Sequence, residues 1–433
     1  MSGTIHRALK VRLYPNKKQE TQILKTLGSC RFLYNQMLVE RIGIYTKLKD
    51  NRGELRLAKY KTEVDYKKDF EWMSDCDSVA LQQSRLDLIA SYQNFFNSLK
   101  GQRKGAKVGF PKFHKKGQKN SYKTLNNNNT IRIDYEKSKV RLPKLGWVNY
   151  KSGNRQWIGK ICSTTISKTP SGKYFASILF EQELELQGVE LRENMKVIGL
   201  DMSLQSFYVD NLGNSPNYQK PFRSNQKKLK HYQRKLSKKI KGSKNREKAR
   251  LKVARVHEKI TNSRKDFVSK LSTKLVREND VIVVENLSLK GMSQALNLGK
   301  SVMDLGYSEF VKQLEYKALW NNKTFIRADK WFASSKTCSY CGYKKKDLQL
   351  DDREWICSNC GATHNRDQNA GQNLRNYGLR ELGLVPTERR EFKPVESKTK
   401  ASGKTEVSLD DEAGILLALD NRKFNKSLTC ELP

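Results

Sequence analysis

Three acidic residues occupy positions from which their side chains could act together. Asp201 ends an apolar run that starts at Met195, Glu285 follows the apolar run 281–284, and Asp367 begins an expected helix. Continuously apolar runs are typical of buried central strands, whose ends place side chains at the edge of a sheet. Converging carboxylates there would bind Mg2+ in a two-metal site that hydrolyses phosphodiesters. Any one such acid is usually a cap or a surface residue, so the prediction rests on all three.

Four of the eight cysteines have a regular spacing. Cys338, Cys341, Cys357 and Cys360 form a C-x2-C-x15-C-x2-C pattern. Each C-x-x-C can form a tight turn that presents two thiolates to one ion, and two such turns complete the tetrahedron that zinc prefers. A redox site would have a single C-x-x-C beside a βαβ pattern. The spacing therefore predicts one structural zinc ion.

The charge of the chain indicates a polyanionic partner. Its 433 residues include 84 Lys and Arg against 45 Asp and Glu, a formal charge of +39. Phosphate backbone would supply the counter-charge for such a body. The densest segment, 223–265, holds eighteen basic and two acidic residues, and a solvated helix face is its alternative interpretation. We expect phosphate contacts from Lys227, Lys228, Lys230, Arg234 and Lys235.

Membrane and secretory classes are excluded at this stage. No stretch approaches the roughly 18 consecutive apolar residues of a membrane span. The N-terminal residues also lack the apolar segment of a secretion signal. At about 100–200 residues per domain, the length predicts two to four domains. We therefore expect an intracellular, multidomain protein that binds nucleic acid.

The elements that must position these residues can be inferred from hydrophobic periodicity. The first half predicts a strand over 5–13, one or two helices over 17–45 and a helix over 79–99 with an apolar stripe from Leu81 to Phe96. Short alternating runs between 130 and 183 predict a small β-barrel or sheet that includes the first strand. The Lys- and Gly-rich segment 101–124 is either a linker or a nucleic-acid contact.

The second half predicts an alternation of strands and helices. Strands are expected over 195–201, 206–210, 280–285 and 324–330. Helices are expected within 223–278, with a break near Gly242, and over 306–320 and 367–378. Residues 381–433 mix polar and charged residues with one short apolar run, which predicts a mobile tail.

Six segments together resemble one known family. These are RLYPNKKQE (12–20), GFPKFHKK (109–116), RLPKLGW (141–147), IGLDMS (198–203), VVENLS (283–288) and CSYCG…CSNCGATHNRDQNAGQN (338–373). They resemble TnpB proteins, RNA-guided nucleases encoded by insertion sequences and related to the type V CRISPR effectors. The resemblance covers about residues 5–380.

The resemblance implies an α/β fold combined with a β-barrel. It places an N-terminal wedge-like β-barrel at 1–16 and 101–193, a helical recognition insertion at 17–100, an RNase H-like (RuvC) nuclease domain at 194–336 and 361–380, a zinc-ribbon insertion that binds target nucleic acid at 337–360, and a tail at 381–433.

The resemblance also implies roles for individual residues. Asp201, Glu285 and Asp367 match the family's three metal-binding acids, and none is substituted. This matters because some relatives that have lost acids act as RNA-guided repressors. Arg366 and Asn369 match the pattern around the third acid, where Asn365 replaces the more usual Asp. The expected cofactors are two Mg2+ ions at the acids and one structural Zn2+.

As a member of this family, the protein would be an RNA-guided endonuclease of a transposable element. One chain would bind one guide RNA derived from the element end and cut double-stranded DNA beside a short motif that the protein itself reads. Gln82 and Asn127 are candidates to pair with adenine in that motif, and Lys112, Lys115 and Lys116 to hold its phosphates. The expected location is the bacterial or archaeal cytoplasm, at the nucleoid and away from membranes.

Two other functions remain open. A catalytically silent RNA-guided or zinc-ribbon regulator would bind DNA without cutting it, and the intact set of three acids disfavours it. An RNase H-like transposase would also use acids but would need no guide. Magnesium-dependent cleavage of the target would distinguish an endonuclease from the silent regulator. A copurified RNA of defined sequence would distinguish it from the transposase.

Overall fold

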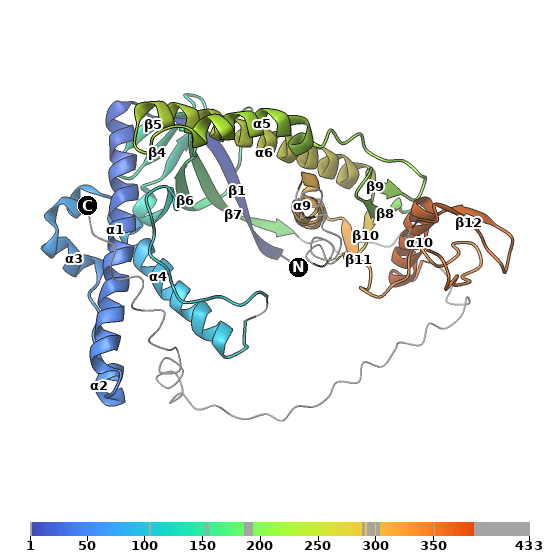
Figure 1. The fold of residues 1–433 in the computed structure, drawn as a ribbon, viewed down its shortest axis with the longest axis horizontal. Helices are drawn as coiled ribbons and strands as arrows, with labels where there is room; N and C mark the ends of the chain where they lie inside the picture. The colour runs from blue at the N-terminus through green and yellow to red at the C-terminus, as the bar shows by residue number, and fades with distance from the viewer. Residues whose placement is uncertain are drawn as a thin grey trace. The chain divides into compact units, whose positions relative to one another are not determined.

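The computed structural model describes residues 2–103, 105–151, 153, 156–185, 194–287, 291, 299, 304–349 and 351–384. They form two compact units, an N-terminal unit within Thr4–Glu183 and a C-terminal unit within Leu184–Glu396 (Figure 1). The tail expected at 381–433 lies outside the described residues from position 385 onward. Among the helices that are described, none is both long and apolar enough to cross a membrane.

Two long helices dominate the helical part of the N-terminal unit. Helix α1 (Lys17–Leu48) is continuous and begins at a capping box, in which Asn16 and Gln19 exchange bonds of 2.9 and 3.0 Å. Helix α4 (Ser78–Leu99) begins where the Asp77 carboxylate accepts a bond from the Val79 amide. The connection contains α2 (Arg52–Leu57), α3 (Glu63–Asp69) and a 3-10 turn at Glu71–Asp75.

The apolar stripe of α4 is narrower than the sequence predicts. Leu81, Leu88 and Phe95 are buried, but Leu86 and Ile89 are 41% and 37% exposed. The buried residues recur every seventh position, which keeps one line of side chains against α1 and β2 and leaves the flanking apolar positions at the surface. The prediction that the whole stripe is core was therefore wrong for Leu86 and Ile89.

The N-terminal unit also contains an open seven-stranded sheet, a half-barrel in which the described residues pair in the order β2-β6-β7-β1-β5-β4-β3. The predicted strands appear within a few residues of their expected bounds. Strand β2 was not predicted and lies at the end of the segment 101–124, which was interpreted as a linker or a nucleic-acid contact. Its sequence signal is weak, because only Tyr122 and Thr124 are buried in the strand. The strands are β1 (Ser2–Tyr14), β2 (Ser121–Leu125), β3 (Arg132–Asp134), β4 (Lys139–Leu142), β5 (Gly146–Lys151), β6 (Lys160–Lys168) and β7 (Tyr174–Glu185).

The C-terminal unit is built on a sheet whose described strands have the order β11-β10-β8-β9. The strands β8, β10 and β11 are parallel, and β9 is antiparallel to β8. All four side chains of β10 are buried, which fits its unbroken apolar sequence. The bounds are β8 (Val197–Ser203), β9 (Phe207–Asp210), β10 (Val281–Val284) and β11 (Thr324–Arg327).

Helices cover both faces of this sheet. Leu200, Ile282 and Val284 point into a core with α6 (Lys244–Glu278) and α9 (Tyr307–Trp320). The alternate residues, Val197, Val281 and Val283 among them, pack instead against Leu374 of α10 (Arg366–Glu381). Since side chains alternate between the faces of a sheet, Asp201 and Glu285 belong to the α10 face.

The strongly basic segment forms a helical hairpin. Helix α5 (Pro221–Ser237) packs on α6 through Leu229, Val256 and Ile260. Gly242 lies in the turn between them with a φ of 86°, so the break predicted there is confirmed. In Figure 1 the two helices run alongside each other.

Candidate functional site

The sheet register brings two of the three predicted acids together. Leu200 of β8 lies opposite Val284 of β10 in the parallel ladder. The next residues along the two strands are Asp201 and Glu285, which therefore leave the sheet side by side at its carboxyl-terminal edge. Asp201 is still within β8, where it pairs with Val209 of β9, so it does not end the strand as predicted.

Close packing of α10 on the sheet places the third acid. A β-carbon at Gly199 would overlap the carbonyl oxygen of Gly371, and one at Gly378 would overlap the Val283 side chain. The helix therefore rests directly on the strands, with Gly371 against Gly199 and the end of β9, and Gly378 against Val197 and Val283. Asp367 lies one turn before Gly371, and its charge acts on Asp201.

The charges of Glu285 and Asp367 both act on the Asp201 carboxyl. Burial raises the pKa of Asp201 well above its ordinary value, and the charges of Glu285 and Asp367 raise it further. The charges of Arg366 and Arg353 act in the opposite direction. Burial also raises the pKa of Glu285. Buried carboxylates that repel one another are a common feature of functional sites, because a cation can relieve the repulsion.

Asp367 is paired with a guanidinium. The Nη1 atom of Arg353 lies 3.2 and 3.3 Å from the two carboxylate oxygens. The Arg353 carbonyl also accepts a bond from the Arg366 amide, which anchors Arg353 beside the first turn of α10. In the part of the chain that the structure describes, the carboxylate oxygens of the three acids do not all lie within 4.8 Å of one another. The ion pair with Arg353 occupies the Asp367 carboxylate.

Tyr307 binds the turn between β8 and β9, and the sequence analysis did not predict this contact. Its hydroxyl donates to the carbonyl oxygens of Ser203 and Phe207, the two ends of the β8–β9 turn. Burial and the charge of Asp201 raise the pKa of the Tyr307 phenol, so the hydroxyl stays protonated as the donor. Its only sequence signal was a tyrosine at the start of a predicted helix.

The four predicted zinc ligands form one cluster. Their sulfur atoms all lie within 4.8 Å of one another, with Cys338–Cys360 at 3.7 Å and Cys341–Cys357 at 3.6 Å. Tetrahedral zinc with Zn–S bonds of about 2.3 Å separates its sulfurs by about 3.8 Å. These separations are far too long for disulfides. The cluster therefore fits a structural zinc ion.

Two matching turns build the cysteine cluster. In the first, Gly342 N donates to Cys338 O and Cys338 N donates to Tyr343 O, at 2.9 and 2.8 Å. In the second, Gly361 N and Cys357 N make the equivalent bonds to Cys357 O and Ala362 O, both at 2.9 Å. Gly342 and Gly361 have φ values of 77° and 69°, which favour glycine. The turns predicted from C-x-x-C-G are confirmed.

The thiols of the cluster differ in acidity. Burial raises the pKa of Cys338 to about 12. At Cys341 burial also raises the pKa, but hydrogen bonds from Asn359 and the Tyr343 amide outweigh it and lower the pKa to about 6. A zinc ion binds thiolates, so Cys341 would provide the first anionic ligand at neutral pH.

His364 is a further contact that the cysteine pattern did not predict. It is buried on β13 (Thr363–Asn365) opposite Trp355 of β12 (Glu354–Ile356). Its Nε2 lies 3.0 Å from Cys338 Sγ. With its proton on Nε2, the imidazole would donate to a zinc-bound Cys338 thiolate and orient it, as outer partners of metal ligands do.

The cysteine cluster is bonded directly to the helix that carries Asp367. Asn369 on α10 accepts a bond from the Ser339 amide at 3.0 Å and donates to the Thr337 carbonyl at 2.8 Å. Asn373, one turn later, also donates to the Thr337 and Ser334 carbonyls. The position of the first cysteine turn is therefore coupled to the first turn of α10.

The predicted nucleic-acid contacts fall on both units. Lys227, Lys228, Lys230, Arg234 and Lys235 are all exposed on α5 of the C-terminal unit. Arg366 donates to the Gln349 carbonyl beside the acids. In the N-terminal unit, Lys112, Lys115, Lys116 and Asn127 are exposed and Gln82 is half-buried on α4. The five basic residues share helix α5, whereas the residues of the N-terminal unit come from α4, from the loop 112–116 and from the turn Asn127–Asn129.

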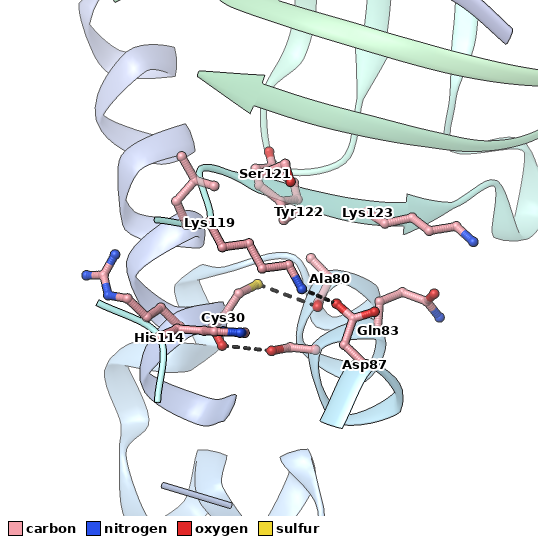
Figure 2. A pocket seen from close by; sticks show the side chains of 12 residues that line it. Cys30, Ala80, Gln83, Asp87, His114, Lys119, Ser121, Tyr122 and Lys123 are labelled. Carbon is pink, nitrogen blue, oxygen red and sulfur yellow. Dashed lines mark hydrogen bonds and ion pairs between the residues drawn. The ribbon is translucent and has the colours of Figure 1, made fainter. Parts of the chain in front are cut away.

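A pocket in the N-terminal unit lies next to Gln82. It is formed by α1, α4 and β2, and Figure 2 shows Lys119 reaching across it to Asp87, at 2.6 Å. Gln83 and Lys123 line it, whereas Gln82, the neighbour that sequence analysis singled out, does not. Periodicity could not separate the two glutamines because both are half-buried on the same helix.

Comparison with known proteins identifies the family. A protein of Streptomyces pristinaespiralis, named "Putative RNA-guided DNA endonuclease", is 31% identical over 385 residues, which cover 88% of this chain and 91% of the relative. InsQ of Escherichia coli K12, with the same description, is 30% identical over 85% of this chain and 91% of its own length. This chain belongs to the TnpB family of IS605-type OrfB proteins.

Family models match three parts of this TnpB protein. The OrfB model described as "Probable transposase" matches residues 177–296, and the model described as "Cas12f1-like, TNB domain" matches 307–374. A model described as "Helix-turn-helix domain" matches 1–50. In the structure the residues of that last match form β1 and the single long helix α1.

The fold of the TnpB protein is similar to that of a solved effector. A Cas12f1 chain, determined by cryo-EM in complex with sgRNA and target DNA, aligns over 86% of this chain and 99% of its own with a TM-score of 0.50. The sequence identity is 15%, so this likeness concerns the fold. The mixed α/β architecture with a half-barrel sheet and a C-terminal cysteine cluster is thus a Cas12f-like fold.

Proposed function

We propose that this TnpB protein is an RNA-guided DNA endonuclease of an IS605-type element and that its C-terminal unit is a RuvC-like nuclease domain. Curated relatives that align with nearly the whole chain bear this description. The observation that carries the proposal is the convergence of Asp201, Glu285 and Asp367 on one edge of the sheet. A DNA-binding regulator has no need for three half-buried carboxylates at one edge of the sheet.

The acids would hold divalent cations, and the donor set fits Mg2+. Hard carboxylate oxygens suit this ion. Burial, and after it the charges of Glu285 and Asp367, raise the pKa of Asp201, and a bound cation would offset both effects. Bound there, Mg2+ would supply an activated water and stabilise the leaving oxygen of a phosphodiester. Asp201 and Glu285 would hold the ion from adjacent strands, and Asp367, now paired with Arg353, would supply the third carboxylate.

Guide RNA and double-stranded target DNA are the proposed partners. The net charge of +39 and the exposed basic side chains of α5 suit a phosphate backbone. Changing Lys227, Lys228, Lys230, Arg234 and Lys235 to Gln together should flatten the dependence of log K on log salt by up to about 0.9 for each duplex phosphate released. An unchanged slope would show that α5 is only a solvated surface.

We further propose that Gln82, Asn127 and the lysines 112, 115 and 116 read and hold the motif beside the target. A carboxamide can pair with adenine through two hydrogen bonds, which gives this set its chemical basis. A library of randomised flanking sequences, cut by the wild type and by Gln82→Ala, tests the assignment. Gln83→Ala is the matched control because Gln83 lines the adjoining pocket. An identical motif preference in Gln82→Ala would remove Gln82 from the reader.

The decisive experiment is guide-programmed cleavage. The protein is expressed with its element end, the RNA that copurifies is sequenced, and a plasmid with the matching target is incubated with Mg2+. Asp201→Asn should lower the cleavage rate by at least about a thousandfold while target binding changes little, because backbone contacts elsewhere carry the affinity. Asp266→Asn removes an exposed carboxylate on α6 and should cut normally.

Each alternative function predicts a different result. A catalytically silent regulator would bind the target without Mg2+-dependent cleavage, even with the wild-type protein. An RNase H-like transposase would act on DNA ends without a defined copurifying RNA. Cleavage by Asp201→Asn within about tenfold of the wild type would overturn the assignment of the acids.

A further inference from the structure

The loop after β11 leaves the sheet at the edge that carries the acids. Val284 lies opposite Arg327 in the β10–β11 ladder, and the Ala328 amide donates to the Val284 carbonyl at 2.9 Å. Glu285 follows Val284 on one strand, and residues 328–332 follow Arg327 on the neighbouring parallel strand. Both segments therefore continue from the same edge of the sheet.

This loop is held in place on both sides of its outermost residue. The Trp331 amide donates to the Asp329 carboxylate at 2.7 Å, and the Phe332 amide donates to the Asp329 carbonyl at 3.1 Å. The Phe332 ring packs against Tyr377 of α10, with centroids 4.9 Å apart. Asn373 of α10 donates to the Ser334 carbonyl at 2.7 Å. The loop thus presents Trp331 from a fixed backbone.

Trp331 is the most exposed of the six tryptophans, at 81%, whereas the next, Trp72 and Trp147, are 48% and 46% exposed. Lys330 lies with its Nζ 4.7 Å from the centroid of the Trp331 ring. Proteins that bind single-stranded nucleic acids combine an aromatic face with a nearby cation, because a base stacks on the ring and a phosphate pairs with the positive charge. Core packing does not explain an indole with four-fifths of its surface in water.

We propose that Trp331 is a stacking platform for an unpaired nucleobase of the DNA strand that reaches the acid site, with Lys330 contacting the adjacent phosphate. The proposal rests on the proposed nuclease function, because it gives the strand a place to be held next to the carboxylates. Stacking requires only a base face, so the platform accepts any sequence.

The test uses the full-length protein without guide RNA and measures binding by fluorescence anisotropy. One probe is a thymidine oligonucleotide of about 12 residues, and the other has the same phosphates but abasic sugars. At raised salt, Trp331→Ala should weaken binding of the thymidine strand by about tenfold and leave the abasic strand unaffected. Trp331→Phe should retain most of the affinity, because an aromatic face remains.

Salt dependence separates the two residues. Trp331 carries no charge, so Trp331→Ala should leave the slope of log K against log salt unchanged, while Lys330→Gln should reduce it by about 0.7 for one single-strand phosphate. Equal affinity of Trp331→Ala and wild type for the thymidine strand would overturn the proposal. An equal loss on both strands would do the same, because it would indicate a disturbed fold. None of these readouts requires cleavage, so they stand apart from the outcome of the Asp201→Asn experiment.

Discussion

The acid site and the cysteine cluster lie in the same unit and are linked through α10, but they are assembled in opposite ways. The cysteine sulfurs lie at separations that suit a tetrahedral ion, held by two local turns with the same hydrogen bonds. The three acids come from two strands and a helix that are far apart in sequence, and they do not close to comparable distances among the described residues. One site is set by local geometry and the other by long-range packing.

The charge of the ligands explains this difference. Thiols can approach one another while protonated, as the high pKa of Cys338 shows. Carboxylates at neutral pH repel, and at the acid site the repulsion is expressed in the raised pKa of Asp201 and in the pairing of Asp367 with Arg353. A cysteine cluster of this kind stabilises the fold around it, whereas an acid site of this kind stores unfavourable charge until a cation binds.

Loss of the zinc ion should have the largest effect on both sites. Cys338→Ser should reduce the zinc content from one ion per chain to near none, because the segment around the cluster has few apolar residues to order it. Since the first cysteine turn is bonded to Asn369, guide-dependent cleavage should also fall, by about a hundredfold. Metal analysis and cleavage assays measure the two effects, with Asp266→Asn, at an exposed side chain on α6, as the control. Full zinc content in Cys338→Ser would contradict the ligand assignment.

Moving α10 should weaken the acid site and leave the cysteine cluster loaded. An alanine at Gly199 would meet the backbone of Gly371 and Arg375, so Gly199→Ala should destabilise the C-terminal unit by about 1–3 kcal/mol. Cleavage should fall by roughly tenfold or more as Asp367 shifts. Gly43→Ala on α1 is the matched control, because nothing lies within 4 Å of a β-carbon there. Unchanged thermal stability in Gly199→Ala would show that the contact does not hold the helix.

The two sites also differ in how far the sequence could predict them. Each cysteine turn is formed by a C-x-x-C segment and the glycine directly after it, so the cluster could be predicted from the local sequence pattern alone. For the acids, the apolar runs before Asp201 and Glu285 predicted strands, but only the register shows that the two residues are neighbours. Contacts such as Tyr307 with the β8–β9 turn, or His364 with Cys338, depend on tertiary packing that periodicity does not contain.

The same limit applies to the rest of the fold. Helix and strand positions followed from periodicity because one face of each element is apolar. The errors occurred where burial depends on neighbours: Leu86 and Ile89 are apolar but 41% and 37% exposed, and β2 joins the sheet although only Tyr122 and Thr124 are buried in it. Glycines 199, 371 and 378 could be identified as close-contact positions only once α10 was seen to rest on the sheet.

The smallest expected effect, on stability, distinguishes the two sites most directly. The folded-state pKa of Asp201 lies above its ordinary value of 3.8, so between the two values the folded protein holds a proton that the unfolded chain has released. This contribution to stability is complete below the ordinary value and is lost as pH rises through the folded-state value. Asp201→Asn removes the ionisable group, so at pH 7 and without Mg2+ it should raise the melting temperature of the C-terminal unit by a few degrees. Near pH 4 the difference in melting temperature should nearly vanish, and Mg2+ should stabilise the wild type more than Asp201→Asn.

Calorimetry measures the melting temperatures at pH 7, near pH 4 and with Mg2+, and Asp266→Asn is the control. A lower melting temperature for Asp201→Asn than for the wild type at pH 7 would show that the ionised Asp201 carboxylate does not destabilise the fold.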